Sequence, residues 1–285
     1  MKRKKDSHKG DFGHLFLLAG SSGLTGAAVM VARSCLRAGA GLVTLGVPET
    51  LIEVFEKQLI EVMTLALPET KNQTLSDKAY KKINNFLEKC DCLAIGPGLS
   101  ANSSTQVLVR KIIKTCKLPM VIDADAINAL AGHLNILRNT QHAIRNTRIL
   151  TPHPGEMARL TGKTVSYIQE NRKSVATKFA KEFGVTLILK GHNTLVADSK
   201  NCYVNRTGNP GMASAGMGDC LTGIVGAFLA QGLDSFSAAK FGAYIHGLAG
   251  DLAAKEKGEL GLIASDLIEK IPEAIKRSSR KKLNC

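Results

Sequence analysis

The sequence predicts an α/β fold with a mainly parallel central sheet and helices on both of its faces. Short apolar or β-branched runs, often bounded by glycine, alternate with longer segments of helical spacing along most of the 285 residues. This alternation is typical of sheets built from repeated β-α-β units. The pattern changes after residue 189, where two close strand signals predict an antiparallel hairpin and further helices complete the chain.

Strands are expected where short apolar or β-branched runs are flanked by turn residues. These runs are 14–19, 41–47, 62–67, 92–96, 119–123, 148–151, 185–190, 194–197 and 202–205. Helices are expected where apolar residues recur at spacings of three and four. These segments are 26–38, 48–58, 76–88, 102–116, 124–130, 167–183, 219–231, 235–255 and 264–278, with a short helix also expected after residue 156.

The chain is expected to form one domain over residues 1–285, with short basic tails at about 1–8 and 277–285. No segment rich in proline, glycine or serine divides it, and large α/β folds permit one domain at this length. The seven cysteines are odd in number and include no C-x-x-C pair. Neither a disulfide framework nor a zinc site is therefore expected.

Composition and targeting signals predict a cytoplasmic protein. Hydrophobic residues make up 44% of the chain, yet no run approaches the roughly 18 apolar residues of a membrane-spanning helix. The basic start turns polar where a signal peptide would need an apolar segment. We therefore expect neither export nor a membrane partner.

The net charge of +14 raises the alternative of a nucleic-acid-binding protein. Much of this excess lies in the terminal stretches 2–5 and 277–282, which contain no acid. The chain also has no tryptophan and few aromatic residues, so stacking platforms for single strands are not expected. We expect no nucleic-acid partner. A strongly salt-dependent affinity that vanishes when the tails are removed would argue otherwise.

A glycine-rich stretch, NPGMASAGMGDCLTGIVGAFLAQG at 209–232, leads into the most apolar helix that the sequence predicts. Leu221, Ile224 and Val225 begin a repeat at helical spacing, so the helix is expected to start near Asp219. Glycines let a ligand approach the backbone, and free N–H groups at a helix start attract phosphate. Because Asp219 would repel such an anion, it either caps the helix or serves as a catalytic carboxylate. The residues alone leave both roles open.

Two further glycine-rich turns follow predicted strands. GPGLSA at 96–101 fits the dinucleotide fingerprint, but Pro97 removes a backbone donor, and the acid Asp123 lies farther away than the usual roughly 20 residues. A standard Rossmann site is therefore disfavoured. AGSSGLTG at 19–26 lacks the ending of a Walker A motif, so it is either a phosphate or substrate loop or a tight turn.

Polar groups also follow predicted strands, at the sheet edge where open α/β folds bind ligands. Asp123 and Asp125 in VIDADAI are candidates for holding Mg²⁺ through water, or for capping the next helix. His153 lies between two prolines in PHPGE, which would fix the direction of its ring, and no histidine at metal spacing accompanies it. KGHNT at 190–194 forms either a plain hairpin turn or a contact to a nucleotide.

Taken together and in this order, these segments resemble one family, the nucleotide-dependent NAD(P)H-hydrate dehydratases of ribokinase-like fold. The matching pieces cover nearly the whole chain and are HKGDFGHLFLLAGS, GAAVMVARSCLRAGAGLVT, AIGPGLS, VIDADAI, ILTPHPGEMARLTG, LILKGHNT, NRTGNPGMASAGMGDCLTGIVGAFLAQG and AAKFGAYIHGLAGD. The resemblance implies a three-layer α/β/α sandwich with a mainly parallel central sheet.

The resemblance also implies an activity, the repair of damaged nicotinamide cofactors. The S-form of hydrated NADH or NADPH would lose water and return to NADH or NADPH. A nucleotide would transfer a phosphoryl group to the ring hydroxyl, which then leaves as phosphate, giving AMP from ADP or ADP from ATP, with Mg²⁺ as cofactor. Family members typically use ADP in bacteria and ATP in eukaryotes, and the choice stays open for this chain.

Partners are implied in the same way. Many bacterial members carry an additional amino-terminal epimerase domain for which this chain has no room. We therefore expect a stand-alone dehydratase whose functional partner, an NAD(P)H-hydrate epimerase, is encoded separately. The family implies a homo-oligomer, a tetramer.

Carried over to this sequence, the resemblance assigns site residues. The hydrated dinucleotide would contact Ala27, Gly98, His153 and Asp219, and the adenine nucleotide would be held by Lys190, Gly191, His192, Asn193, Thr194, Gly216 and Gly218. Asp219, the acid of the superfamily's G-x-G-D motif, would be the general base that takes the proton of the ring hydroxyl. The closest rival is a ribokinase-like kinase for a small alcohol, such as a vitamin precursor. PHPGE, KGHNT and HKGDFG better match the dehydratases.

Overall fold

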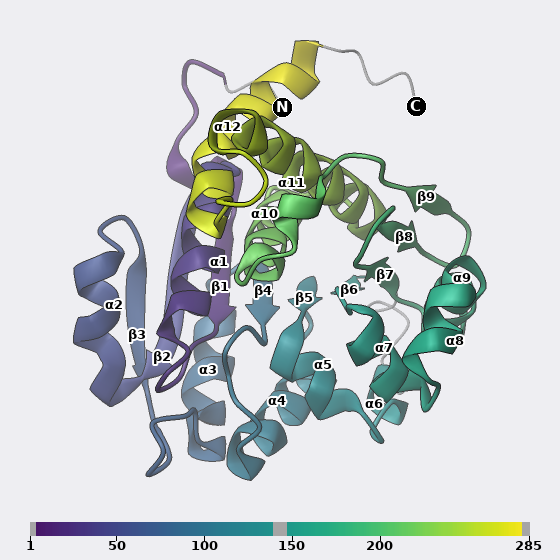
Figure 1. The fold of residues 1–285 in the computed structure, drawn as a ribbon. Helices are drawn as coiled ribbons and strands as arrows, with labels where there is room; N and C mark the ends of the chain where they lie inside the picture. The colour runs from purple at the N-terminus through teal and green to yellow at the C-terminus, as the bar shows by residue number, and fades with distance from the viewer. Residues whose placement is uncertain (1–3, 139–146, 281–285) are drawn as a thin grey trace.

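The strands form one nine-stranded sheet in the order β3-β2-β1-β4-β5-β6-β7-β8-β9 (Figure 1). The computed structural model describes residues 4–138 and 147–280, so the outer ends of both basic tails lie outside it. Every strand overlaps one of the expected runs. The strands are β1 (His14–Leu18), β2 (Leu42–Pro48), β3 (Met63–Leu67), β4 (Cys92–Ile95), β5 (Met120–Ile122), β6 (Arg148–Leu150), β7 (Thr186–Leu189), β8 (Leu195–Ala197) and β9 (Cys202–Val204).

The helices lie in the connections between strands and at the end of the chain. They are α1 (Thr25–Arg37), α2 (Ile52–Gln58), α3 (Tyr80–Leu87), α4 (Ser103–Thr115), α5 (Ala124–Leu130), α6 (Asn135–Arg138), α7 (Pro154–Thr161), α8 (Val165–Glu170), α9 (Arg172–Phe183), α10 (Met217–Ala230), α11 (Ser235–Lys257) and α12 (Ala264–Arg280). None of the described helices is long and apolar enough to span a membrane.

The sheet is mainly parallel, as predicted. All neighbouring strands from β1 to β7 pair in parallel, whereas β8 is antiparallel to β7 and β9 is antiparallel to β8. The antiparallel hairpin expected after residue 189 is therefore confirmed. The helices α1, α10, α11 and α12 lie on one side of the sheet, and α3, α4, α5 and α7 lie on the other (Figure 1).

Strand β1 shows why its sequence is apolar without alternation. Leu15 and Leu17 pack into the core beneath α1 and α10, whereas Phe16 and Leu18 pack into the core on the opposite face. A parallel strand covered on both sides needs apolar residues at every position. The two cores place β1 in the centre of the three layers.

Helix α6 was not expected, α7 and α10 begin earlier than expected, and two further segments also differ from the expectation. The segment 167–183, predicted as one helix, forms α8 and α9, because the backbone of Asn171 leaves the helical conformation, with φ −118° and ψ 24°. In segment 48–58, β2 continues to Pro48, and a 3₁₀ turn, Glu49–Leu51, precedes α2. Neither difference moves a predicted site residue.

The direction of strand addition reverses at β1 and β4. From β1 the chain adds β2 and β3 on one side, and it then returns to place β4 on the other. Such a reversal leaves a crevice at the carboxyl ends of the two strands, where open α/β sheets bind ligands. Both of the glycine-rich turns that follow β1 and β4 lie at this point.

Candidate functional site

The turns after β1 and β4 are hydrogen-bonded to each other. The Gly20 N–H donates to the Pro97 carbonyl at 2.9 Å, and the Ser21 hydroxyl donates to the Gly98 carbonyl at 2.8 Å. A Cβ atom added to Gly98 would lie 3.2 Å from the Cβ of Ala27, the third residue of α1. Two residues predicted to contact the substrate, Ala27 and Gly98, are therefore neighbours.

Gly96 owes its residue type to a contact inside the protein. Its φ is +133°, and a Cβ atom there would lie 1.8 Å from the Asp123 carbonyl oxygen at the end of β5. Helix α4 begins only at Ser103, with the Asn102 side chain accepting from the Ser104 N–H as its cap. Close backbone packing accounts for this glycine without a dinucleotide.

A buried ammonium group joins three segments of the site. The Nζ atom of Lys190, directly after β7, lies 2.8 Å from Oδ1 of Asp123 and 3.7 Å from Oε2 of Glu156 in α7. A Cβ atom added to Gly218, near the start of α10, would lie 3.4 Å from the same Nζ. Of these side chains, Lys190 is 18% exposed, Asp123 1% and Glu156 6%. Residues predicted separately thus converge on Lys190.

Asp123 occupies the cap position of α5, but its side chain makes no capping bond. Its Oδ1 accepts from Lys190, and its Oδ2 accepts from the Thr222 hydroxyl at 2.7 Å. Burial alone would raise the pKa of Asp123, yet the Lys190 charge and these hydrogen bonds outweigh it and hold the pKa below its usual value. The capping alternative for Asp123 is therefore wrong, and the carboxylate is a structural anion within the cluster.

Asp219 is not a helix cap either. Helix α10 begins at Met217, two residues earlier than expected, and its cap is Gly216 in a left-handed conformation with φ +85°. No described residue donates a hydrogen bond to the Asp219 carboxylate. Burial, followed by the charge of Asp123, raises its pKa to about 7. A carboxyl group with a pKa near neutrality is suited to general acid–base work.

His153 is held as the prolines predicted. It caps α7, because its Nδ1 accepts from the Gly155 N–H at 3.0 Å, and the Glu156 carboxylate accepts from the His153 N–H at 2.7 Å. A ring whose Nδ1 accepts must carry its proton on Nε2 when neutral. The side chain is 49% exposed, and its Nε2 atom lies 3.6 Å from Oε1 of Glu156.

The KGHNT segment forms the turn between β7 and β8. Arg172 at the start of α9 donates to the Leu189 carbonyl at 3.0 Å and to the Lys190 carbonyl at 3.3 Å. The Thr194 hydroxyl donates to the Gly191 carbonyl at 2.9 Å, which closes the turn. The guanidinium therefore fixes the strand end from which the Lys190 side chain reaches the cluster.

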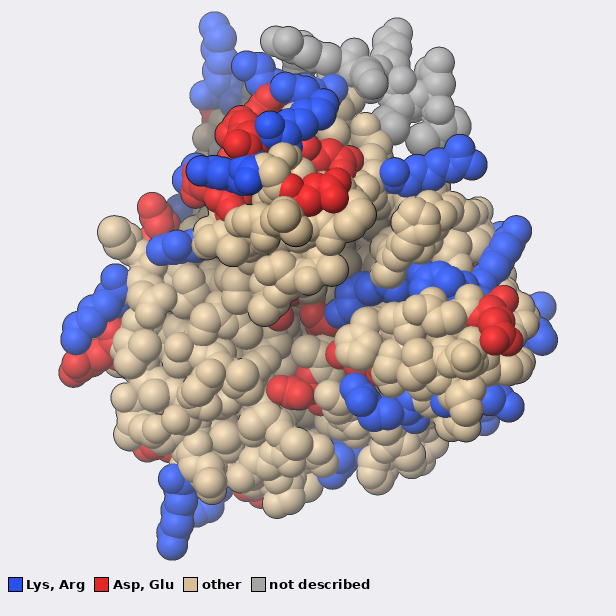
Figure 2. Space-filling view, in the orientation of Figure 1, with Lys and Arg blue, Asp and Glu red and all other residues tan. Residues whose placement is uncertain are grey.

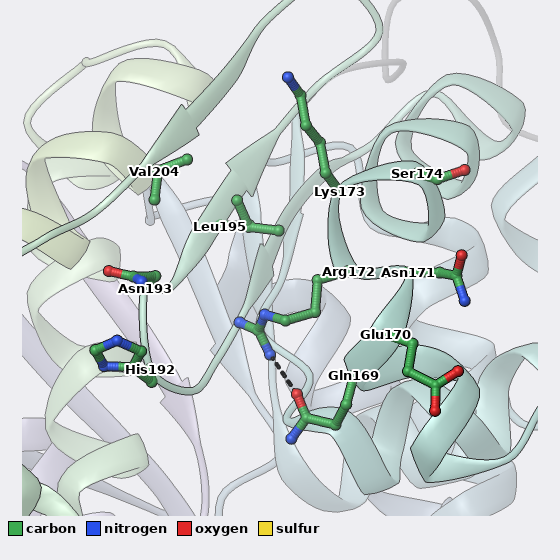
Figure 3. A pocket seen from close by; sticks show the side chains of 10 residues that line it. All are labelled: Gln169, Glu170, Asn171, Arg172, Lys173, Ser174, His192, Asn193, Leu195 and Val204. Atoms are coloured by element: carbon green, nitrogen blue, oxygen red, sulfur yellow. Dashed lines mark hydrogen bonds between the residues drawn. The ribbon is translucent and has the colours of Figure 1, made fainter.

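A pocket of about 520 Å³ opens beside this turn (Figure 3). The close-up shows His192 and Asn193 on one side of the hollow, and Arg172 with its partner Gln169 on the other. Its volume falls within the range of small-molecule sites. Two of the residues predicted to hold the nucleotide thus line a cavity.

Acidic side chains dominate the centre of the site. In the space-filling view, acidic groups lie at the bottom of a central hollow, between the helices of the two faces (Figure 2). Asp123, Asp125 and Glu156 all lie close enough to Asp219 to raise its pKa through their charges. An anionic ligand entering here needs positive charge from Lys190 or from a bound cation.

The expectation that Asp123 and Asp125 hold Mg²⁺ through water stays a prediction. In the described part of the chain, no group of three or more His, Cys, Asp or Glu side chains is arranged to hold a metal ion. Asp123 is bonded to Lys190 and Thr222, and Asp125 accepts from the Ser100 N–H at 2.8 Å. Mg²⁺ commonly keeps several waters and takes its other ligands from substrate phosphates. The residues present fit an ion that arrives with a nucleotide.

Three residues of the site were not predicted. From the sequence, no role was assigned to Glu156 in the PHPGE motif. A glutamate three residues after a helix cap is nevertheless a known sign of a capping box. Thr222 is a fully buried polar residue on an apolar helix, and such residues need a hydrogen-bond partner. For Arg172, whose contacts are to backbone carbonyls, the sequence carries no signal.

Comparisons with known proteins point to one family. A sequence model of the NAD(P)H-hydrate dehydratase family matches residues 15–273. The bifunctional NAD(P)H-hydrate repair enzyme Nnr of Moorella thermoacetica is 44% identical over 276 residues, covering 96% of this chain and 51% of that enzyme. The ADP-dependent (S)-NAD(P)H-hydrate dehydratase of Neisseria meningitidis is 38% identical over 269 residues, covering 93% and 86%. The chain thus spans about half the length of the bifunctional relatives that it matches.

Solved structures share the fold. The ADP/ATP-dependent NAD(P)H-hydrate dehydratase from Bacillus subtilis, co-crystallised with ATP/Mg²⁺, has a TM-score of 0.81 at 31% identity, covering 97% of this chain and 93% of that chain. A ribokinase-like superfamily protein from Enterococcus faecalis has a TM-score of 0.81 at 26% identity, covering 97% and 91%. The ribokinase-like α/β fold is therefore confirmed.

Proposed function

Because this chain belongs to the NAD(P)H-hydrate dehydratase family, we propose that it uses an adenine nucleotide to remove water from hydrated NADH or NADPH. The substrate would be the S-form, and ADP would yield AMP, or ATP would yield ADP. One observation carries the proposal: a carboxyl group with a pKa of about 7, Asp219, lies at the amino end of α10, within electrostatic reach of Lys190.

The hydroxyl on the hydrated ring is the group to be activated. Asp219, in its ionised form, would accept the hydroxyl proton as the oxygen attacks the terminal phosphorus of the nucleotide. The Gly218 N–H at the helix start and the Lys190 ammonium would stabilise the negative charge on the phosphoryl group in flight. The nucleotide would leave with one phosphate fewer.

The phosphorylated ring can then lose phosphate. The lone pair of the ring nitrogen would expel phosphate from the adjacent carbon, and loss of a proton from the next carbon would restore the double bond of the reduced nicotinamide. The overall change is loss of water from the hydrate and hydrolysis of one phosphoanhydride bond. Bound Mg²⁺ would supply charge neutralisation at the nucleotide phosphates.

The remaining predicted residues divide between the two ligands. Ala27 and Gly98 adjoin each other at the crevice between β1 and β4, and the His153 side chain is about half exposed. These residues would hold the hydrated dinucleotide. The nucleotide would be bound by the turn after β7 and by the start of α10, namely by Lys190, Gly191, His192, Asn193, Thr194, Gly216 and Gly218.

The direct test is an assay on the purified protein. Hydrated NADH or NADPH would be incubated with Mg²⁺ and either ADP or ATP, and the return of the reduced nicotinamide followed by its near-ultraviolet absorbance. We expect turnover that requires a nucleotide and stops when Mg²⁺ is chelated. Absorbance that stays constant with both nucleotides would contradict the proposal, and the faster nucleotide identifies the co-substrate.

The Asp219→Asn variant tests the assigned base. Asparagine keeps the size of the side chain but cannot accept the proton, so we expect turnover to fall by about a hundredfold or more. Nucleotide binding, measured by calorimetry, should change little. A variant that turns over at a rate close to that of the unaltered protein would remove Asp219 from the mechanism.

A further inference from the structure

Helix α11 carries a segment, His246–Asp251, that the proposed reaction does not use. The Nε2 atom of His246 lies 2.8 Å from the carbonyl oxygen of Met217, the first residue of α10. A carbonyl oxygen only accepts hydrogen bonds, so the ring must donate from Nε2. The imidazole therefore holds the residue that directly precedes Gly218 and Asp219.

This hydrogen bond acts on the next peptide group. The carbonyl of Met217 and the N–H of Gly218 belong to one planar peptide unit, in which the two bonds point in opposite directions. Fixing the carbonyl therefore fixes the direction of the Gly218 N–H. Gly218 itself lies next to Lys190, because a Cβ atom on Gly218 would be 3.4 Å from the Lys190 Nζ.

The same helix holds the other end of the connection that leads into α10. The two carboxylate oxygens of Asp251 accept from the Gly208 N–H and from the Asn209 side-chain amide, each at 3.0 Å. One carboxylate thus binds two successive residues. The connection 208–217 is anchored to α11 at both of its ends.

Helix α11 is also shaped to receive this connection. A Cβ atom on Gly247 would lie 2.2 Å from the Thr207 hydroxyl, and one on Gly250 would lie 2.3 Å from the Met212 sulfur. A larger residue at Gly247 would require the Thr207 backbone to move, and one at Gly250 would displace the Met212 side chain. Glycine at both positions lets the loop lie directly on the helix surface between the two polar anchors.

We propose that His246 is a positioning residue for phosphoryl transfer, which orients the Gly218 N–H and the Asp219 carboxylate through the Met217 carbonyl, with Asp251 securing the far end of the same connection. This role rests on the proposed function. Burial lowers the pKa of His246 to about 4, so the ring is neutral at physiological pH and adds no charge next to Lys190. A neutral donor can orient a peptide group without competing for the phosphate.

The test compares two substitutions that differ in one property. His246→Leu fills a similar volume but has no donor, and His246→Gln keeps an N–H group that can reach the carbonyl. We expect kcat of the leucine variant to fall about tenfold or more, because the lost interaction acts in the transition state. Its KM for nucleotide should stay within about threefold of that of the unaltered protein. The glutamine variant should regain most of the rate. Lys255→Ala, an exposed change on the same helix, should leave kcat unchanged.

Hydrogen exchange provides a readout that does not depend on turnover. We expect the backbone amides of residues 213–221 to exchange faster in His246→Leu than in the unaltered protein or in His246→Gln. Wild-type kcat and wild-type exchange in the leucine variant would overturn the inference, and so would equal losses in both variants. If the unaltered protein does not dehydrate the hydrates, the proposed function fails, and the exchange comparison alone decides whether His246 orders the start of α10.

Discussion

Asp123 and Asp219 are two aspartates of one cluster whose pKa values are shifted in opposite directions. Lys190 and Thr222 bind both carboxylate oxygens of Asp123 and keep it ionised, despite its burial. Burial and the charge of Asp123 disfavour the ionised form of Asp219, so its pKa rises to about 7. Pairs of titratable groups that are pushed apart in this way often divide structural and catalytic roles. Only Asp219 is left free to exchange a proton.

The pH dependence of the reaction should report this group. If Asp219 must be ionised to act as a base, kcat/KM should fall with one proton below a pKa of about 7. At about pH 6 the rate constant should be roughly tenfold below its plateau. Rates measured across the acid range, with enzyme stability checked at each pH, test this expectation. A flat profile through neutrality would count against Asp219 as the base.

A second variant separates Asp219 from other titrating groups. Asp123→Asn removes a neighbouring negative charge, which is the second cause of the raised pKa, and leaves the burial of Asp219 in place. The acid limb of kcat/KM should therefore move to lower pH in this variant. If the acid limb of kcat/KM lies at the same pH in this variant as in the unaltered protein, the titrating group is another one, such as a group on the substrate.

The same pKa shift predicts that Asp219 destabilises the fold. Its pKa is about 7 in the folded state against 3.8 for an unperturbed aspartate, so the native protein binds the proton more tightly and loses stability as pH rises from about 4 to 7. The shift corresponds to about 4 kcal/mol at most, and solvent reduces it at this partly exposed group. Asp219→Asn should raise the unfolding free energy by roughly 2 kcal/mol above neutral pH.

Urea unfolding at several pH values measures this gain. The difference in unfolding free energy between Asp219→Asn and the unaltered protein should shrink as pH falls toward 4, where the folded state carries a neutral side chain at residue 219 in both proteins. Asp234 offers a control of opposite sign, because its hydrogen bonds from Ser237 at the start of α11 lower its pKa. Asp234→Ala should lower stability at neutral pH, and that loss should fade on acidification. No pH dependence in the Asp219→Asn difference would contradict the prediction.

At the scale of elements, local patterns predicted helix α10 but not the geometry of its first turn. The apolar spacing from Leu221 onward located the helix, since a buried helix shows its period in the sequence. Its start lies earlier because Gly216 takes a left-handed conformation, in which a Cβ atom would lie 2.2 Å from the Met30 sulfur. That contact comes from α1, so no local pattern could reveal it. Two extra residues place Asp219 inside the helix, which rules out the cap, and its role as the base stays a prediction.

Helix α7 was expected after residue 156 but begins at Pro154, although the signals for its start are local. Proline at its first position and His153 before it determine where the helix begins, and both signals lie within a few residues. The sequence could not predict that Glu156 also approaches Lys190, because this contact depends on the pairing of β6 with β7. The signals for the start of α7 could be read within the element, whereas its contact with Lys190 depends on the topology.

For the whole molecule, the sheet order brings distant segments into one site. Thr222 and Asp123 are separated by 99 residues, and Lys190 and Asp123 by 67, yet both pairs are in contact. The sequence placed Asp123 and Lys190 at the carboxyl ends of parallel strands, and those ends meet at one edge of a sheet. That rule predicted the edge but not the partners, because strand order cannot be derived from spacing along the chain.

Because the site joins segments from both helical layers, ligand binding should stabilise the molecule as a whole. A nucleotide that binds only the folded protein adds about 2.7 kcal/mol at a hundred times its Kd. For a chain of this size we expect Tm to rise by roughly 5–10 °C with Mg²⁺ and the preferred nucleotide. Thermal unfolding with ADP, with ATP and with Mg²⁺ alone measures this shift.

One pair of histidine variants assigns the shift to the predicted nucleotide turn. His192 is exposed on the pocket beside that turn, whereas His133 is exposed away from it, so neither substitution by alanine should change the Tm of the free protein by more than about 1–2 °C. His192→Ala should reduce the nucleotide-induced rise in Tm if His192 contacts the bound nucleotide as proposed, and His133→Ala should retain the full rise. Equal rises in both variants would exclude the His192 side chain from the nucleotide site. The absence of any rise with either nucleotide in the unaltered protein would contradict the nucleotide-dependent reaction itself.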